Sequence, residues 1–265
     1  MTVRKSATSF TLPSISYRVW KVWRRNFDVF MKTAGVNFLP SILEPILYLV
    51  AFGFGLGALV QNIGGVPYIR YIAPALVAIA IMQGSFFECT YSSFVRMYYQ
   101  KTFDAIIATP ISVEEVIAGE ILWGATRALI NSTAVLAVVA IFGLVSTPLV
   151  LLIPLLAFTG GLMFGSLGMC FTALSPNIDS FNYPIFLLIT PMFLLSGTFF
   201  SLSQLPQAVQ TLALALPLTH VVNITRFLVV GKFPTNLALG IIWIAVATVI
   251  FFILSINLMK RRLIK

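Results

Sequence analysis

The stretch "NLALGIIWIAVATVIFFILSINLMKRRLIK" (236–265) decides the class of the protein. Residues 236–259 carry no charged side chain, and three cations follow at once at 260–262. A helix that crosses a bilayer needs about 20 predominantly apolar residues. The rest of the chain has the same character, because 59% of its 265 residues are hydrophobic and only 9% are charged. Helices that are apolar on every side leave no face for water, so this composition indicates a membrane protein.

Five further apolar segments precede this one. The six predicted spans cover residues 38–60, 71–95, 114–143, 148–174, 183–200 and 236–259. All are long enough to cross a bilayer as helices, whereas a membrane barrel would need alternating strands of about ten residues. We therefore expect an all-α polytopic membrane protein. Its parts would be an N-terminal region (1–37), a six-helix transmembrane domain (38–259) and a basic tail (260–265).

The distribution of Lys and Arg predicts the orientation of these spans. Six spans place both termini on one side, and that side also holds the connection between the second and third spans. Thirteen of the 17 cations lie there, three lie on the other side (Arg70, Arg226 and Lys232), and Arg127 falls inside the third span. The excess of cations marks the cytoplasmic side, so both termini should be cytoplasmic. The net charge of +9 is then a matter of topology, and we expect no nucleic-acid partner.

The chain offers little for catalysis or metal binding. His220 is the only histidine, and the two cysteines, Cys89 and Cys170, lie inside apolar segments where they are typical packing residues. The sequence contains no GxxxxGK[ST] loop of the kind that cradles nucleotide phosphates. We expect no catalytic residue, no metal and no cofactor in this chain, and no enzymatic activity of the chain alone.

The segment "SYRVWKVWRRNFDVFMK" (16–32) is too highly charged to cross a membrane. A helical wheel places one set of aromatic and apolar side chains on one face: Trp20, Trp23, Phe27, Phe30 and Met31. Four cations lie on the other face: Arg18, Lys21, Arg25 and Lys32. This pattern predicts an amphipathic helix at the membrane surface, with its cations toward anionic lipid. It serves either as a simple membrane anchor or also as part of a docking surface.

Half of the eight carboxylates lie in "KTFDAIIATPISVEEVIAGE" (101–120). Ser112 and Glu115 have the spacing of a capping box, which accounts for part of this acidity. We expect a short helix from Asp104 to Ala108 to continue below the second span, and Pro110 to end it. Its sequence, "FDAIIATP", is apolar, and no domain of the chain is available to cover it. An exposed apolar helix of this kind predicts a soluble partner with a groove.

Four charged residues fall inside the predicted spans: Glu44, Glu88, Glu120 and Arg127. A lone charge at the bilayer centre costs about 2.5–3.5 kcal/mol on insertion scales, so Arg127 should have a partner or wet surroundings. Glu120 lies on its own helix, whereas Glu88 and Glu44 lie across the bundle. The group forms either a structural ion pair or a vestibule that admits the polar head group of a substrate.

The segment "SGTFFSLSQLPQAVQTLALALPLTH" (196–220) is unusual for an external loop. Gly197 marks the end of the fifth span, and Pro206–Leu216 predicts a short apolar helix ended by Pro217. About ten residues cannot cross a bilayer, so we expect a re-entrant or interfacial hairpin on the outer side. It either packs around the ends of the spans or gates the exit. Candidate gate residues are Phe199, Phe200, Leu205, Pro206, Pro217 and His220.

In their order and spacing, these segments resemble the ABC-2 type permeases, the membrane subunits of bacterial ATP-driven exporters. The resemblance covers most of the chain. It is carried by "LEPILYLVAFGFGLG" (43–57), "FECTYSSFVRM" (87–97), the stretch 101–120, "SLGMCFTALSP" (166–176), "TPMFLLSGTFFSLSQLP" (190–206) and "LPLTH" (216–220). Within this family the chain is most similar to permeases of nodulation-factor (lipo-chitooligosaccharide) exporters.

The resemblance implies a homodimer of six-span subunits in the bacterial inner membrane. It also implies two copies of a separate subunit that binds ATP and Mg²⁺. Residues 99–110 match the coupling helix that docks in that subunit, and 201–219 match the outer re-entrant helices. Coupling residues would be Thr102, Phe103, Asp104, Ile107, Thr109, Pro110 and Glu114. The substrate, an amphiphile such as a lipid-linked saccharide, a lipid or a drug, would pass along a dimer interface lined by spans one, two and five.

Two other classes of function remain open on the sequence. A gradient-driven secondary transporter of small amphiphiles would show discontinuous helices at the membrane midplane and inverted repeats, and neither is clear here. A membrane anchor that recruits a cytosolic protein would use the same loop without moving a substrate. Nucleotide-dependent transport separates the exporter from both, and proton or sodium dependence would single out the secondary transporter.

Overall fold

The computed structural model describes residues 13–60, 62–63, 65–231 and 237–264. The first twelve residues of the predicted N-terminal region therefore lie outside the described residues, as do Lys232 and Lys265. Within the described chain, six helical segments are long and apolar enough to cross a membrane: Ala34–Leu59, Tyr68–Tyr99, Val113–Ile141, Pro148–Leu174, Ile178–Leu195 and Leu237–Leu263. The prediction of an all-α protein with six spans is confirmed.

Several spans are built from more than one helical piece. The first joins α2 (Ala34–Tyr48), the π-helical η1 (Leu49–Leu56) and α3 (Gly57–Leu59), and the second is α4 (Tyr68–Phe87) with η2 (Glu88–Ser92) and η3 (Val95–Tyr99). The third is α6 (Val113–Ile141), the fourth η4 (Pro148–Leu152) with α7 (Ile153–Leu174), and the sixth α12 (Leu237–Leu263). The fifth comprises η5 (Ile178–Phe181), α8 (Asn182–Pro184), η6 (Ile185–Ile189) and α9 (Thr190–Leu195).

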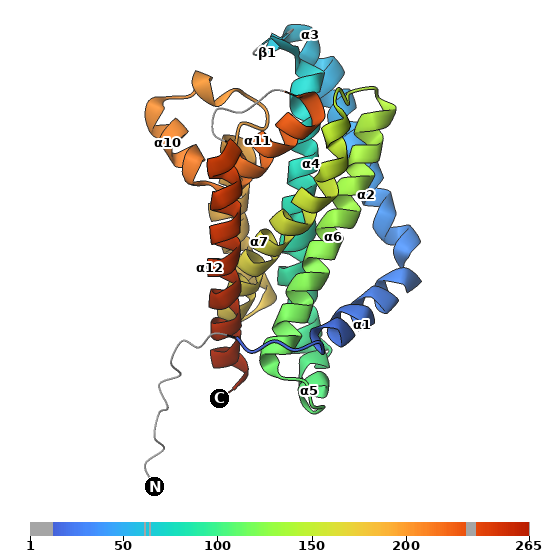
Figure 1. Cartoon of the computed structure of the whole chain (residues 1–265), viewed down its shortest axis with the longest axis vertical. Coiled ribbons are helices and arrows are strands. Elements are labelled where there is room, and N and C mark those ends of the chain that lie inside the picture. Colours follow the sequence, from blue (N-terminus) through green and yellow to red (C-terminus); the bar gives the residue numbers. More distant parts are fainter. Residues whose placement is uncertain (1–12, 61, 64, 232–236, 265) are drawn as a thin grey trace.

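The shorter elements lie at the two ends of the bundle (Figure 1). At one end are α1 (Val19–Lys32), α5 (Thr102–Ile107) and the C-terminal end of α12. At the other end are a two-residue hairpin, β1 (Asn62–Ile63) and β2 (Val66–Pro67), with η7 (Leu202–Gln204), α10 (Gln207–Ala215) and α11 (Pro217–Val230). We call these the inner and the outer end.

Helix α4 is the centre of the bundle, because it packs against α6, α7 and α11. Small residues let these helices approach closely. A Cβ placed on Gly161 would lie 2.8 Å from Cα of Ala125, and one on Gly168 would lie 2.9 Å from the carbonyl oxygen of Phe86. Any larger residue at either position would therefore push α7 away from its neighbours.

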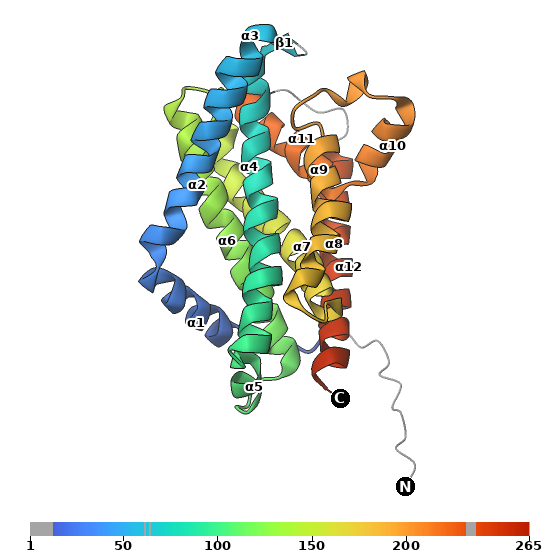
Figure 2. The same cartoon turned by 180° about the vertical axis from the view of Figure 1, so that it is seen from behind.

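Helix α2 stands at the edge of the bundle. It packs on α6, whereas the contact of the first span with α4 comes mainly from η1. Figure 2 shows α2, α4 and α8–α9 on one face of the molecule. Large apolar side chains are exposed on two of these elements, α2 (Leu39, Leu43 and Leu47) and the fifth span (Tyr183, Phe186 and Leu187).

Two span boundaries differ from prediction for identifiable reasons. The second span continues to Tyr99 instead of residue 95, because Arg96 is held inside the bundle by ion pairs rather than lying in a loop. The fifth span runs from Ile178 to Leu195 instead of from 183 to 200. It ends early because Gly197 adopts the left-handed conformation, with φ of 72°, which turns the chain.

Candidate functional site

The predicted coupling segment is a separate helix rather than a continuation of the second span. Lys101 adopts a left-handed backbone conformation, with φ of 55°, and this interrupts the helix before α5 begins at Thr102. Phe103 is fully buried in a cluster with Phe94 and Val113, so it anchors α5 to the protein's own core, and its role in coupling stays a prediction. An aromatic side chain near the start of a short helix can turn back into the core in this way.

The part of this segment that faces solvent is small. Asp104, Thr109 and Pro110 are exposed, and Ile107 is partly exposed. Thr102 is partly buried, and its hydroxyl accepts a hydrogen bond from Arg25 Nη2 at 3.5 Å. Burial lowers the pKa of Arg25, and the charge of Glu120 opposes that shift.

Glu114 points into the protein instead of toward a partner. It is buried, and its Oε1 lies 2.5 Å from Nζ of Lys260 in the C-terminal region. Its Oε2 accepts a hydrogen bond from the backbone N–H of Ser14 at 2.5 Å. This carboxylate therefore joins Ser14 and Lys260 to the start of α6, and its assignment as a docking contact stays a prediction.

The capping box at the start of α6 is confirmed. Ser112 Oγ accepts from the backbone N–H of Glu115 at 3.2 Å, and the Glu115 side chain accepts from the N–H of Ser112 at 2.8 Å. The hydroxyl of Ser16 donates to the other oxygen of Glu115, and Arg18 donates to the carbonyl of Pro110. Residues 13–18, which we call the N-terminal strap, therefore lie against the loop that follows α5.

Helix α1 packs with a face that only partly coincides with the predicted apolar face. Val22, Asn26 and Phe30 are its buried residues, and it packs on α6. A Cβ on Gly119 would lie 2.6 Å from Cβ of Val22, so the close contact requires glycine there. Trp20 and Met31, both assigned to the membrane-facing set together with Phe30, are each 55% exposed, whereas Phe30 is buried. The wheel missed Asn26 because a polar side chain was not expected on the packed face.

Asn26 is buried because it belongs to a polar cluster centred on Glu120. The Glu120 carboxylate is fully buried and accepts from Asn26 Nδ2 at 2.8 Å and from Ser93 Oγ at 2.9 Å. Arg96 donates to it through Nε at 2.9 Å and Nη2 at 2.5 Å. Three elements, α1, α6 and the inner end of the second span, thus meet at one carboxylate.

The role of Arg96 in this cluster was not predicted from the sequence, because Arg96 lies one residue beyond the predicted second span (71–95). Its Nη1 also donates to Glu88 Oε1 at 2.8 Å, so it bridges two of the predicted intramembrane glutamates. It is one of the thirteen cations assigned above to the cytoplasmic side, in the connection between the second and third spans. Its position eight residues after Glu88 was a usable signal, because eight residues place two side chains near one face of a helix.

Arg127 pairs with Glu88 rather than with Glu120 on its own helix. Its Nε lies 3.5 Å from Glu88 Oε2, and its guanidinium lies over the ring of Phe30, 4.7 Å from the ring centre. Its Nη1 is buried without a hydrogen-bond partner in the described chain. Trp123 Nε1 donates to Glu88 Oε1 at 3.0 Å. Glu44 belongs to no hydrogen bond or ion pair among the described residues.

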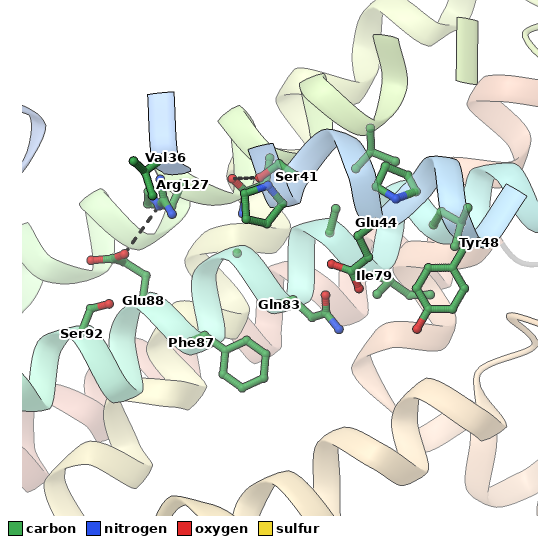
Figure 3. A pocket seen from close by; sticks show the side chains of 17 residues that line it. Val36, Ser41, Glu44, Tyr48, Ile79, Gln83, Phe87, Glu88, Ser92 and Arg127 are labelled. Carbon is green, nitrogen blue, oxygen red and sulfur yellow. Dashed lines mark hydrogen bonds and ion pairs between the residues drawn. The ribbon is translucent and has the colours of Figure 1, made fainter. Parts of the chain in front are cut away.

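A cavity of about 480 Å³ lies between α2, α4 and α6, and we call it the inner slot. Figure 3 shows its polar side chains in sequence along α4: Ser92 and Glu88 with Arg127, then Ser41 and Gln83, then Glu44 and Tyr48. Ser41 Oγ donates to Asn131 Oδ1 at 3.2 Å, which connects α2 to α6 across the slot. Glu88, Arg127 and Glu44 therefore share one cavity, whereas Glu120 is enclosed behind it.

At the outer end, α10 and α11 form a helix pair bent by 86°. The pair extends to Val230, beyond the predicted end of the hairpin at residue 219. The candidate gate residues do not converge on one point. Phe199 is buried against Phe52 and Phe193, Phe200 is half-exposed, and His220 stacks on Trp243 with ring centres 5.0 Å apart. Leu205 and Pro206 precede α10 on the surface, and Pro217 is the buried first residue of α11.

A partly buried arginine holds the turn after the fifth span. Arg226 Nη2 donates to the carbonyl of Gly197 at 2.9 Å, and its guanidinium lies over Tyr71, 4.0 Å from the ring centre. The Tyr71 hydroxyl lies 3.0 Å from the same carbonyl and 2.9 Å from that of Phe200. We call this group the outer clasp. It joins α4, the turn at 196–200 and α11.

Comparison with known proteins identifies the family to which this chain belongs. Residues 17–230 match the model of the ABC-2 type transporter family. Nodulation protein J of Sinorhizobium fredii is 37% identical over 254 residues, which cover 96% of this chain and 97% of that protein. Nodulation protein J of Rhizobium leguminosarum bv. viciae is 36% identical, over 96% of this chain and 98% of its own length. The inner membrane transport permease YadH of Escherichia coli is 22% identical over 91% of this chain.

The matched region includes α1, five of the six spans, α5 and the helix pair α10–α11. The match to the relatives extends over nearly the whole chain, and their lengths agree with it. The chain therefore belongs to the ABC-2 type transporter family, as a multi-pass membrane transport permease.

Proposed function

We propose that this permease is the membrane-spanning part of an ATP-driven exporter and that a separate ATP-binding subunit docks at its inner end. ATP and Mg²⁺ would be held by that subunit. The observation that carries the proposal is the construction of the docking surface. Asp104, Thr109 and Pro110 are exposed on and after α5, and the N-terminal strap bonds to Pro110 and Glu115 in the adjoining loop and helix start.

This support matters for coupling a motion to the spans. A push on α5 would reach α6 through the Ser112–Glu115 cap and would reach α1 through Arg25 and Thr102. Because α1 also shares the Glu120 cluster with the second and third spans, a displaced α5 has rigid connections to three elements. A helix attached only by a mobile loop would transmit no such force.

The same proposal includes a homodimer in the bacterial inner membrane with both termini in the cytoplasm. The face of α2, α4 and α8–α9 carries exposed apolar side chains on two separate elements, which suits contact with a second copy and with lipid (Figure 2). The cations of α1 and of the C-terminal end of α12 lie at one end of the bundle, which favours that end as the cytoplasmic one.

An amphiphile is the substrate class that the inner slot supports. The slot combines charged and amide side chains with apolar walls, and it runs along the middle of the second span. Two of the relatives reported above are nodulation J proteins, so a lipid-linked saccharide is the first substrate to assay; a lipid and a drug follow.

The test is copurification of the tagged full-length chain with its ATP-binding subunit in mild detergent, followed by measurement of ATP hydrolysis and transport. We expect a stable complex with ATPase activity. Asp104→Lys combined with Ile107→Trp should remove the subunit and reduce transport at least about tenfold, since they disrupt a contact surface. Gln207→Lys, an exposed change at the outer end, is the matched control and should have no effect.

Two outcomes would contradict the proposal. Full ATPase stimulation by the double variant would show that the subunit docks elsewhere. Transport that follows a proton or sodium gradient, without any nucleotide requirement, would replace the exporter with a secondary transporter.

A further inference from the structure

The inner slot has the shape and the polarity of one amphiphilic molecule. Ser92 and Leu76 mark its limits along the second span, so at about 1.5 Å per residue it runs roughly 24 Å. Its inner part is polar, with Ser92, Glu88 and Arg127. Its outer part has apolar Leu76, Ile79, Ala80 and Val135, with Glu44 and Tyr48 on the α2 side. A ligand with a polar head between Arg127 and Glu44 and a chain along these apolar residues would match this lining.

The slot is accessible from the side rather than enclosed. Helix α2 packs on α6 instead of on α4 over this length, so the slot lies between α2 and α4, with residues of α6 as its floor (Figure 3). The packing of η1 on α4 closes the outer end. Glu44 is exposed and projects from α2 into this space, opposite Gln83.

The slot offers one strong donor and one strong acceptor to a ligand. Arg127 Nη1 is buried with no hydrogen-bond partner in the described chain, although its Nε is near Glu88. A guanidinium in this position requires an acceptor such as a phosphate or carbonyl oxygen. The Glu44 carboxylate, which has no described partner, requires a donor such as an ammonium or a hydroxyl group.

The charges around the slot favour some head groups over others. Glu88 and Glu120 are balanced by Arg96 and Arg127, which leaves Glu44 as one uncompensated negative charge among the described residues. In a medium of lower dielectric than water, that charge repels an anionic ligand over several ångströms. A zwitterionic or uncharged head group avoids this repulsion and still satisfies both Arg127 and Glu44.

We propose that the inner slot binds one amphiphile from the adjacent leaflet, with its acceptor group on Arg127 and a donor group on Glu44, and that Glu44 excludes head groups with net negative charge. The occupant is a molecule that carries both a donor and an acceptor in its head, such as a zwitterionic lysophospholipid. This inference rests on the proposed function only in treating the occupant as cargo; the site itself is defined by the residues that line it.

The experiment uses the full-length chain in phosphatidylcholine nanodiscs, without nucleotide or ATP-binding subunit. Choline has no N–H donor, so the background lipid competes poorly for Glu44. The probes are 16-carbon lysophosphatidylethanolamine and lysophosphatidylglycerol, each with a photoactivatable diazirine in the acyl chain. Labelled peptides are mapped by mass spectrometry, and competition with unlabelled lipid tests saturation.

We expect lysophosphatidylethanolamine to label peptides that contain Tyr48 and Ile79, saturably, and lysophosphatidylglycerol to label them about tenfold less. Glu44→Gln should bring the two probes within about twofold of each other, since it removes the repulsive charge. Asp179→Asn removes an exposed carboxylate outside the slot and should leave the ratio unchanged. Ala80→Phe fills the slot and should abolish both signals.

Equal labelling of the unmodified chain by both probes would overturn the proposed selectivity, as would an unchanged ratio in Glu44→Gln. Labelling that does not saturate, or that maps outside α2 and α4, would overturn the site. Because no nucleotide is present, these failures leave the exporter proposal intact. Conversely, if the chain binds the probe and its transport does not depend on ATP, the proposed site stands and the exporter proposal fails.

Discussion

The polar cluster centred on Glu120, which we call the inner cluster, and the outer clasp each hold an arginine. The two arginines have opposite kinds of surroundings. At the inner end, Arg96 faces two carboxylates and shares Glu120 with Asn26 and Ser93. At the outer end, Arg226 has no carboxylate within ion-pair distance in the described chain; its partners are the carbonyls of Gly197 and Tyr71 and the ring of Tyr71. The inner arginine is held by opposite charge, the outer one by dipoles.

This difference has a mechanical meaning. Removing one member of a buried ion pair leaves an uncompensated charge, so the inner cluster resists any rearrangement that separates its parts. The clasp depends on carbonyls at the end of a helix and on a turn, and these can be exchanged for water or for other carbonyls at lower cost. We infer that the inner end moves as a unit and that the outer end opens by local rearrangement.

Removal of the Glu120 carboxylate should lower the stability of the protein more than any other change proposed here. Glu120→Ala leaves Arg96 half-paired, and we expect a loss of about 3–5 kcal/mol in the free energy of unfolding. Thermal unfolding of the purified chain in detergent measures it. Glu44→Ala, which removes a carboxylate without a described partner, is the control and should cost little. A second substitution, Arg96→Met, should recover part of the loss; if it adds to the loss instead, the ion-pair account fails.

Arg226→Met should be the next largest change. It removes a charge-assisted hydrogen bond to Gly197, which is worth about 1.5–3 kcal/mol. Amide hydrogen exchange should accelerate in the turn after the fifth span and remain unchanged at the start of α6. Arg70→Met, an exposed cation on the same side, serves as the control. Equal acceleration at both ends would show that the clasp and the inner cluster are one cooperative unit.

Ser112→Ala should weaken only the start of α6. It removes the side-chain acceptor of the capping box, at a cost of about 1 kcal/mol. The expected result is a lower unfolding temperature together with faster exchange at residues 113–116. Ser112→Thr keeps the hydroxyl and should restore most of the stability. If the threonine variant is as unstable as alanine, the serine acts through packing rather than through the cap.

The coupling between Arg127 and Glu88 should be the smallest of the four effects. The two groups are 3.5 Å apart, so a double-mutant cycle with Arg127→Met and Glu88→Gln should give about 0.5–1 kcal/mol. The cycle that pairs Arg127 with Glu120 should be additive, because Glu120 is directed toward Arg96. A larger coupling with Glu120 would place Arg127 inside the inner cluster and blur the boundary between cluster and slot.

The sequence predicted those features that depend on local composition. The six spans follow from apolar length, and the capping box follows from Ser112 and Glu115 three residues apart. The short outer helix was also predicted, because Pro206 and Pro217 bound an apolar run at α10. Each of these needs only neighbouring residues, so no knowledge of packing was required.

Features that depend on packing could not be predicted in this way. Arg96 read as a loop cation because its role appears only when the second span continues past residue 95 and meets Glu120. The burial of Phe103 could not be predicted, because the core that receives it is built from residues distant in the sequence. The partner of Arg127 was left open among three glutamates, and the distance to Glu88 selects one of them.

The N-terminal strap also orders events during synthesis of the chain. Ser14 and Ser16 bond to residues 100 and 99 positions later, so these contacts cannot form until the start of the third span has left the ribosome. At about 5–20 residues per second, the strap waits roughly 5–20 s after its own emergence. Its closure therefore records that the first two spans and the start of the third have been synthesised, and a ribosome stalled before residue 115 would leave the strap open.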